Sequence, residues 1–194
     1  MSPRGVAIPD VRERLFAAAE RVLAREGPAG LTNRSVTEEA DCAKGLLYNH
    51  FADLDDFMAQ LVLDRFERIA AEVAPLPGRA GSGEVRENLT GAALVLLGTT
   101  GPVIAAAALA RQGATQRVRL AWEAGAPGPD AVEGAIVRYL EAEQRLGRVR
   151  ADADCAMLAL ALVGTVHHLL MHGDRSADGA QLVRRLVDAL VTEA

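Results

Sequence analysis

The apolar residues of this chain recur at intervals of three and four, which is the spacing of helices with one buried face. The pattern predicts a first helix that begins at the cap Asp10 and ends at Gly27-Pro28. It predicts a longer helix from about residue 53 to Val73, whose acidic start favours the helix dipole. The two apolar stripes consist of Val11, Leu15, Ala18, Ala19, Val22 and Leu23, and of Phe57, Leu61, Ile69 and Val73. Each helix is therefore expected to bury one side.

Two shorter helices joined by a tight turn are predicted between these long ones. The first runs from about Asn33 to Ala40, with Thr32 placed to accept backbone N–H groups of the first turn. The turn is 41–43, and its Asp41 is a residue type that tolerates a positive φ. The second helix covers 44–51, with Leu47 and Phe51 facing inward. Its outer side then carries Lys44, Leu46, Tyr48, Asn49 and His50, and such a helix can lie in a major groove.

The rest of the chain also has the pattern of helices. Residues 75–83 are rich in Pro and Gly and are predicted to be a linker. Helices are expected at about 84–97, 103–112, 117–123, 130–146, 152–172 and 178–192, with Asp130 and Asp152 as helix starts. Half of the residues are hydrophobic but only 4% are aromatic, so the core must be built from Ala, Leu and Val. The predicted fold class is all-α.

Cysteine content and hydropathy bound the cellular setting. Only Cys42 and Cys155 are present, in separate predicted elements, so no disulfide framework is expected and a reducing cytoplasm fits. The amino terminus has no apolar signal core. The most apolar run, 92–110, is interrupted by Gly98 and Gly101-Pro102, which favours a buried helix pair over a membrane span. A cytoplasmic protein without membrane association is therefore predicted.

Around the predicted turn the sequence resembles the amino-terminal DNA-binding domain of the TetR family of bacterial transcriptional regulators. The positions that match the family's second and third helices are Thr32, Arg34, Val36, Ala40, Gly45, Leu47, Tyr48, His50 and Phe51, with Cys42 a near match. The departures are Thr37 for the usual Ala, Asp41 for Gly, Ala43 for the capping Ser or Thr, and Leu54 for a Lys. The resemblance is close over about the first 70 residues and one of layout beyond them.

The resemblance implies a three-helix, helix-turn-helix DNA-binding domain at 1–56 and a helical effector-binding and dimerisation domain at 57–194. It implies a dimeric transcriptional regulator, most often a repressor, on a pseudo-palindromic operator in double-stranded DNA. Tyr48 and His50 are expected on phosphates, and Lys44, Leu46 and Asn49 at or near base edges. The full set of predicted DNA-binding residues is Thr32, Arg34, Lys44, Gly45, Leu46, Tyr48, Asn49 and His50.

The net charge of the predicted DNA-binding domain does not favour DNA binding, although its motif does. Residues 1–56 contain seven cations and ten anions, a net charge of −3, within a chain of net charge −5. Basic excess is the usual footprint of a DNA-binding domain, because phosphate neutralisation supplies most non-specific affinity. The acidic balance, Ala43 and Leu54 leave an alternative open. That alternative is a helical ligand-binding or interaction protein of the same fold that has lost specific operator binding.

An effector site is predicted in the larger domain. Gly98, Gly101 and Pro102 break the apolar stretch, and small side chains at 105–108 line a gap without filling it. The predicted effector is small and largely apolar, and its binding is expected to release the operator. The candidate anchors are Thr99, Arg111, Trp122, Tyr139, His167 and His168. For each anchor the alternative is an interhelical hydrogen bond or a surface position.

The helices predicted at 152–172 and 178–192 are candidates for a homodimer interface. The first carries apolar residues around its whole axis, and such a helix must be covered on most sides. These residues are Met157, Leu158, Leu160, Ala161, Leu162, Val163 and Val166, and the last helix offers Leu182, Val183, Leu186, Val187 and Leu190. A two-fold bundle of both helices would bury them.

No enzymatic site is indicated by the sequence. A nucleophile elbow, a phosphate loop and a zinc-protease signature are all missing. His168 and His172 have the i, i+4 spacing of a two-point metal clamp, but a third ligand is not evident. The alternatives, both favoured over a metal, are a polar contact in a pocket or at the dimer interface and ordinary helix-end or surface histidines. No enzyme, metal or cofactor is therefore predicted.

Overall fold

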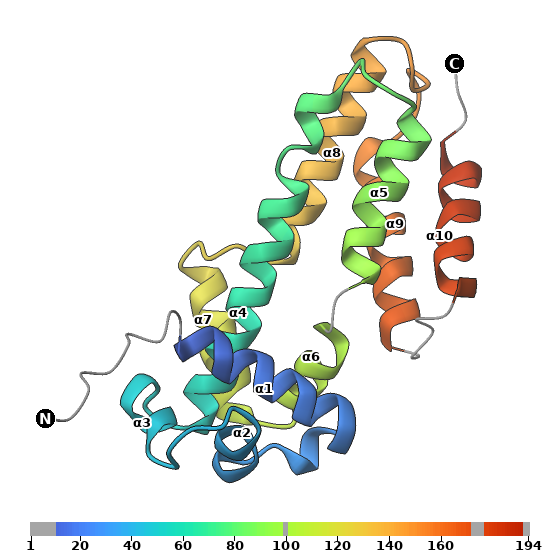
Figure 1. Cartoon of the computed structure of the whole chain (residues 1–194). Coiled ribbons are helices and arrows are strands. Elements are labelled where there is room, and N and C mark those ends of the chain that lie inside the picture. The colour runs from blue at the N-terminus through green and yellow to red at the C-terminus, as the bar shows by residue number, and fades with distance from the viewer. Residues whose placement is uncertain (1–10, 99–100, 172–176, 192–194) are drawn as a thin grey trace, which may run out of the picture. The chain divides into compact units, whose positions relative to one another are not determined.

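The computed structural model describes residues 11–98, 101–171 and 177–191, and within them all regular elements are helical. The order along the chain can be followed in Figure 1. The α-helices are α1 Val11–Glu26, α2 Asn33–Glu39, α3 Leu46–His50, α4 Leu54–Val73, α5 Val85–Leu97, α6 Gly101–Leu109, α7 Gln112–Glu123, α8 Pro129–Arg145, α9 Cys155–Met171 and α10 Ala177–Leu190. Two 3-10 helices are η1 Pro28–Gly30 and η2 Leu76–Arg79. The predicted all-α class is confirmed.

The chain forms two compact units, one of residues 1–62 and 103–121 and the other of 63–102 and 122–194. The long helix α4 contributes residues 54–62 to the first unit and residues 63–73 to the second. These units differ from the expected domains 1–56 and 57–194, because residues 103–121 are part of the amino-terminal unit. The functional division into those two domains stays a prediction.

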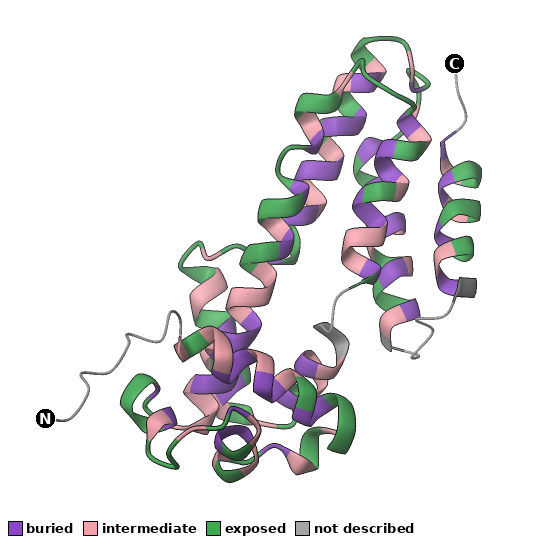
Figure 2. Ribbon diagram, in the orientation of Figure 1, coloured by how far each residue is buried: buried purple, intermediate pink, exposed green. Residues whose placement is uncertain are grey.

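The first unit is built on an aromatic cluster behind the helix-turn-helix. The ring centroids of Phe16 and Phe51 are 5.6 Å apart, and those of Phe51 and Phe57 are 4.9 Å apart, edge to face. All three side chains are buried, and Figure 2 shows the buried positions along α1. The predicted stripe of α1 is confirmed in burial from Leu15 onward. Burial of each such side chain is worth about 1.5–3 kcal/mol, so the cluster holds α1, α3 and α4 together.

The second unit packs α5 against α9 and α10, and α8 against α9 and η2. These helices lie side by side in Figure 1. The core consists of Ala, Val and Leu side chains with Tyr139 among them, and the end of α4 joins it through Ile69 and Val73. Residues 75–83 link α4 to α5 as expected and are mostly exposed, but Leu76 is buried and the Gly81 N–H donates to Glu143. This segment is part of the packed unit.

Helix α7 begins at Gln112, five residues before its predicted start, and three further helix starts differ from their predictions for local reasons. Helix α6 begins at Gly101, since proline fits the first turn of a helix. Helix α8 begins after Gly128 with proline in its first turn, so Asp130 lies inside the helix and is not its cap. The cap of α9 is Asp154, whose carboxylate accepts the Met157 N–H at 3.0 Å, whereas Asp152 pairs with Arg150. None of the helices in the described part of the chain is long and apolar enough to cross a membrane.

Candidate functional site

Helix α2 is stabilised at its start by reciprocal side-chain bonds. The Thr32 hydroxyl accepts the Ser35 N–H at 3.0 Å, and the Ser35 hydroxyl accepts the Thr32 N–H at 2.9 Å, which is a capping box. The buried Thr37 donates its hydroxyl to the Asn33 carbonyl at 2.8 Å. The residue that departs from the family pattern is thus satisfied inside the helix. The predicted cap at Thr32 is confirmed.

The turn holds α3 close to α2. Asp41 has φ 49°, the positive value predicted for it. The Asn33 side-chain amide donates to the Lys44 carbonyl at 3.2 Å. Helix α3 is shorter than predicted, five residues from Leu46 to His50, and its cap Gly45 has no side-chain bond to offer. Helix α3 is therefore held in position by the turn and by its buried side chains more than by a cap.

The two faces of α3 separate as the periodicity predicts. Leu47 is fully buried and Phe51 is 2% exposed, whereas the Tyr48 side chain is 56% exposed. Lys44, Gly45, Asn49 and His50 are exposed and Leu46 is half-buried. Lys44 is the single lysine of the chain. The face offers an ammonium, a phenol, an amide and an imidazole together, which suits phosphate and base contacts.

Arginines of α1 brace the helix-turn-helix from behind. Arg14 donates to the Ala40 carbonyl at 2.7 Å, and Arg21 and Arg25 both pair with Glu39, at 2.6 and 2.9 Å. The side-chain hydrogen bonds from Arg21 and then Arg25 lower the pKa of the Glu39 carboxyl. The Arg12 guanidinium lies 4.8 Å from the centre of the Phe51 ring. These contacts orient α2 and α3 relative to α1.

Arg34 lies at the exposed start of α2. It pairs with Glu38 one turn later at 2.8 Å, with both side chains more than half exposed. Such exposed pairs are worth about 0–1 kcal/mol, so a phosphate can displace the glutamate at little cost. The predicted role of Arg34 in DNA binding is compatible with this geometry and stays a prediction, as do the roles of Thr32 and the α3 residues.

The start of α4 carries two ion pairs that sequence reasoning missed. Asp53 caps α4 by accepting the Asp56 N–H at 2.6 Å and also pairs with Arg117 at 2.9 Å. The hydrogen bond from the Asp56 backbone, and then Arg117, lower the pKa of the Asp53 carboxyl. Asp55 pairs with Arg111 at 2.7 Å. No local pattern links these residues, and only the arginines of 111–119, unaccompanied by acids, offered a signal.

The structure does not gather the predicted effector anchors into one site. Thr99 lies outside the described residues, and Arg111 is paired with Asp55 in the first unit. Trp122 packs edge-on against Phe66 at 5.3 Å between ring centres, and its buried indole nitrogen has no hydrogen-bond partner. His167 and His168 are both exposed on α9. The role of these residues in ligand binding stays a prediction.

Tyr139 is engaged in a buried polar network. Its side chain is fully buried, and its hydroxyl oxygen accepts the Asn88 amide N–H at 2.9 Å. Desolvation by burial, partly offset by that bond, raises the pKa of Tyr139 to about 12. The fully buried Glu143 accepts the Gly81 N–H and lies 3.5 Å from Arg148. The network ties α5 and the η2 segment to α8, which is a structural role.

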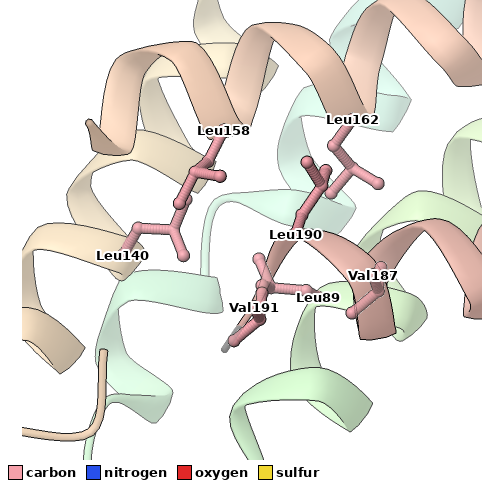
Figure 3. Close-up of a pocket in the computed structure, with 7 residues that line it drawn as sticks. All are labelled: Leu89, Leu140, Leu158, Leu162, Val187, Leu190 and Val191. Atoms are coloured by element: carbon pink, nitrogen blue, oxygen red, sulfur yellow. The ribbon is translucent and has the colours of Figure 1, made fainter. Parts of the chain in front are cut away.

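A small apolar pocket lies inside the second unit. Figure 3 shows the aliphatic side chains that line it, from α5, α8, α9 and the end of α10. They are Leu89, Leu140, Leu158, Leu162, Val187, Leu190 and Val191. The room inside is about 10 Å³, which is roughly the space of one water molecule. Any effector larger than this must separate the helices to enter.

The described residues contain no group of three or more His, Cys, Asp or Glu side chains placed to hold a metal ion. His172, one member of the predicted two-point clamp, lies outside them. Cys42 and Cys155 are free thiols, and desolvation raises the pKa of both. Neither thiol therefore has the lowered pKa of a reactive cysteine.

Comparison with known proteins agrees with this geometry. Residues 15–61 match the family model described as bacterial regulatory proteins, tetR family. No curated protein matches the chain.

Solved structures resemble the fold at low sequence identity. NemR of E. coli in its reduced form is 17% identical, with TM-score 0.72 over 94% of this chain and 98% of that one. FadR of Bacillus subtilis, solved in complex with stearoyl-CoA, is 15% identical, with TM-score 0.69 over 93% and 97%. A TetR transcriptional regulator of Streptomyces coelicolor is 21% identical, with TM-score 0.61 over 94% and 99%. Residues 15–61 thus match the model of the tetR family of bacterial regulatory proteins, and the chain as a whole has the same fold as solved TetR transcriptional regulators.

Proposed function

We propose that this protein is a dimeric DNA-binding transcriptional regulator, a repressor that leaves its operator when a small, largely apolar effector binds. The observation that carries the proposal is the separation of faces on α3. Leu47 and Phe51 are buried, and this fixes the helix, while Lys44, Tyr48 and Asn49 remain at the surface. A chain with no use for DNA has no evident reason to expose these groups together on a braced helix.

DNA recognition is tested by selecting fragments from random duplex DNA with the intact protein. Asn49→Ala should relax sequence preference, because an asparagine amide reads base edges. Tyr48→Phe should weaken binding to selected and random fragments alike, because a phosphate contact carries no sequence information. Gel-shift titrations at one salt concentration compare the two variants with Arg138→Gln, an exposed residue of α8 in the second unit. The same effect of both α3 variants on both kinds of DNA would refute the assigned roles.

The dimer is proposed through the outer faces of α9 and α10. Met157 and Leu160 on α9 are 57% and 49% exposed, and Leu182 on α10 is 38% exposed. The opposite face of α9 is buried within the unit through Ala159, Leu162 and Val166. A helix that is apolar on both sides is expected to cover its outer side with a second copy.

Light scattering at micromolar concentration tests the dimer. The wild-type mass should be twice 20.5 kDa, and Leu160→Glu should lower it to 20.5 kDa. Leu109→Glu is the matched control, because Leu109 is 66% exposed on α6 in the first unit. A wild-type mass of 20.5 kDa would rule out the dimer.

The effector is proposed to enter the second unit among α5, α8, α9 and α10. The lining of the small pocket is wholly aliphatic, which favours an apolar ligand. FadR of Bacillus subtilis was solved with stearoyl-CoA, whose stearoyl chain is apolar. A ligand can shift the protein away from its DNA-binding form only by preferring the other form. Effector binding and operator release therefore both depend on the equilibrium between the DNA-binding form and the other form.

A thermal-shift screen of matched apolar and polar metabolites tests this part of the proposal, followed by operator titrations with each stabilising compound. Apolar compounds should raise the unfolding temperature and weaken DNA binding. Stabilisation by highly polar compounds alone would refute the apolar effector. Stabilisation by apolar compounds with unchanged operator affinity would refute the coupling.

A second candidate is a protein of this fold that binds ligands or partners without reading an operator. The observation in its favour is the missing side-chain cap of α3, together with the net charge of −3 over residues 1–56. The fragment selection separates the two functions. For a protein of this second kind, selected fragments would bind no more tightly than random duplex DNA.

A further inference from the structure

The charge of the DNA-binding unit changes when its full extent is considered. Residues 1–56 carry a net charge of −3, which disfavours contact with phosphates. The compact unit also includes 103–121, and that segment contributes three arginines and no carboxylate. The two contributions cancel, so the unit is formally neutral. Residues distant in sequence from the helix-turn-helix therefore correct its charge.

Two of these arginines are directed at specific carboxylates. The Arg117 guanidinium lies 2.9 Å from Asp53, and the Arg111 guanidinium lies 2.7 Å from Asp55. The side chains are between 32% and 50% exposed, so the pairs lie at the surface. Surface pairs of this kind contribute little to folding. Loss of either pair is therefore expected to change the free energy of unfolding little.

Gly113 allows the second pair to form. A Cβ at this position would lie 2.3 Å from an oxygen of Asp55 and 3.1 Å from its carboxyl carbon. Any side chain at 113 would thus push the carboxylate away from its present position. The close approach also places the Asp55 charge at the first turn of α7, where the helix dipole favours it.

The two aspartates follow the proposed DNA-binding helix closely in sequence. Asp53 is three residues after His50, so their Cα atoms are no more than about 11 Å apart. Charges within about 10 Å of one another act without full screening at 0.1 M salt. Unneutralised carboxylates at 53 and 55 would therefore repel the phosphates that Tyr48 and His50 are proposed to contact. The family's usual lysine next to them is Leu54 in this chain.

We propose that Arg111 and Arg117 are positioning residues for DNA binding, which neutralise Asp53 and Asp55 and so let phosphates approach α3. The inference rests on the proposed function and adds a part of the site that lies about 60 residues further along the chain. The arginines act through the two aspartates and need not touch DNA themselves. Asp53 keeps its capping bond to Asp56 in the presence of Arg117.

The experiment measures affinity of the full-length protein for a fragment that the wild type selects from random duplex DNA. Arg111→Gln with Arg117→Gln should weaken binding about 10-fold at low salt, because two carboxylates lose their counter-charges near the phosphates. The control is Arg138→Gln with Arg145→Gln, which removes the same charge from α8 in the second unit. It should leave affinity within about 2-fold.

A rescue variant separates charge neutralisation from a structural bridge. Asp53→Asn and Asp55→Asn added to the two arginine changes remove both the pairs and the excess negative charge, and asparagine still caps a helix. Affinity should return to within about 3-fold of the wild type if the aspartates alone repel DNA. A structural bridge would stay broken in this variant, and affinity would stay low.

Gly113→Ala gives an independent readout that does not change charge. The methyl group displaces the Asp55 carboxylate, while alanine favours the helical state over glycine. Affinity should fall without a lower unfolding temperature. Wild-type protein that selects no fragment overturns the proposed function and this inference with it. Wild-type binding with an unaffected arginine variant, or a rescue variant that stays weak, overturns only the inference.

Discussion

In the helix-turn-helix segment the polar residues of α3 are exposed to solvent, whereas in the second unit Asn88, Tyr139 and Glu143 lie in the core and form hydrogen bonds there. Tyr48 is 56% exposed, and Tyr139 is fully buried with its hydroxyl bonded to Asn88. Both tyrosines were expected to contact a ligand, DNA in one case and an effector in the other. In this structure only the Tyr48 side chain is exposed, and the role of Tyr139 in effector binding stays a prediction.

The difference has a physical origin. The five-residue helix α3 buries only Leu47, together with Phe51 that follows it, so Tyr48, Asn49 and His50 are left exposed. In a helical unit of several layers, a polar residue at the buried spacing must find a partner or lose the energy of its hydrogen bonds. Polar residues inside a packed unit are therefore weaker evidence of a ligand site than polar residues on a thin, braced element.

The largest effect is expected from the aromatic cluster behind α3. Phe51→Ala should destabilise the first unit by about 3–5 kcal/mol, because it leaves a cavity beside Phe16 and Phe57. Urea denaturation followed by circular dichroism measures the loss. Tyr48→Ala on the outer face of the same helix should change stability by no more than about 0.5 kcal/mol. Equal losses would mean that the two faces are not separated as described.

The buried network of the second unit should give the next largest effect. Glu143→Ala removes the acceptor of the Gly81 N–H and the counter-charge of Arg148, and should cost about 2–3 kcal/mol. Glu141→Ala, on an exposed position of the same helix, is the matched control. Chemical denaturation measures both variants. A Glu143 variant as stable as its control would show that the network does not hold η2 against α8.

Tyr139 should make stability depend on alkaline pH. Its pKa is raised to about 12 in the folded protein, above the ordinary value of 10, so its contribution is complete below pH 10 and is lost as pH rises to 12. The change amounts to about 2–3 kcal/mol. Urea midpoints between pH 9 and 12 should fall less in Tyr139→Phe than in the wild type.

Much of the fold could be predicted because its signals are local. The bounds of α1, α2 and α4, the cap Thr32 and the positive φ of Asp41 follow from residues within one or two turns. The predicted start of α9 at Asp152 is wrong because Asp152 pairs with Arg150, and Asp154 caps the helix instead.

The missed part of the candidate site depends on contacts between distant residues. Arg117 meets Asp53 across 64 positions, and Tyr139 meets Asn88 across 51. No spacing rule connects such pairs in one sequence. The arginines near 111–119 could be noticed as a cluster, but the carboxylates they face could not be named.

The smallest predicted effect compares the two helices of the helix-turn-helix themselves. Helix α2 has a capping box at Thr32 and Ser35, whereas α3 begins at Leu46 and its cap residue Gly45 makes no side-chain bond. Thr32→Ala should therefore cost about 1 kcal/mol, and Thr32→Ser should cost much less because it keeps the hydroxyl. Ala43→Ser restores a hydroxyl before α3, where Leu46 N–H now bonds only to the Ala43 carbonyl at 2.9 Å, and should add up to about 1 kcal/mol. The urea midpoint of each variant measures these changes, and gel shifts with the selected fragment show whether a better-capped α3 also binds more tightly. A stabilising Ala43→Ser variant with unchanged DNA affinity would show that the buried face and the turn already hold α3 in its binding position. A variant with no gain in stability would show that the start of α3 has no free N–H for a hydroxyl to accept.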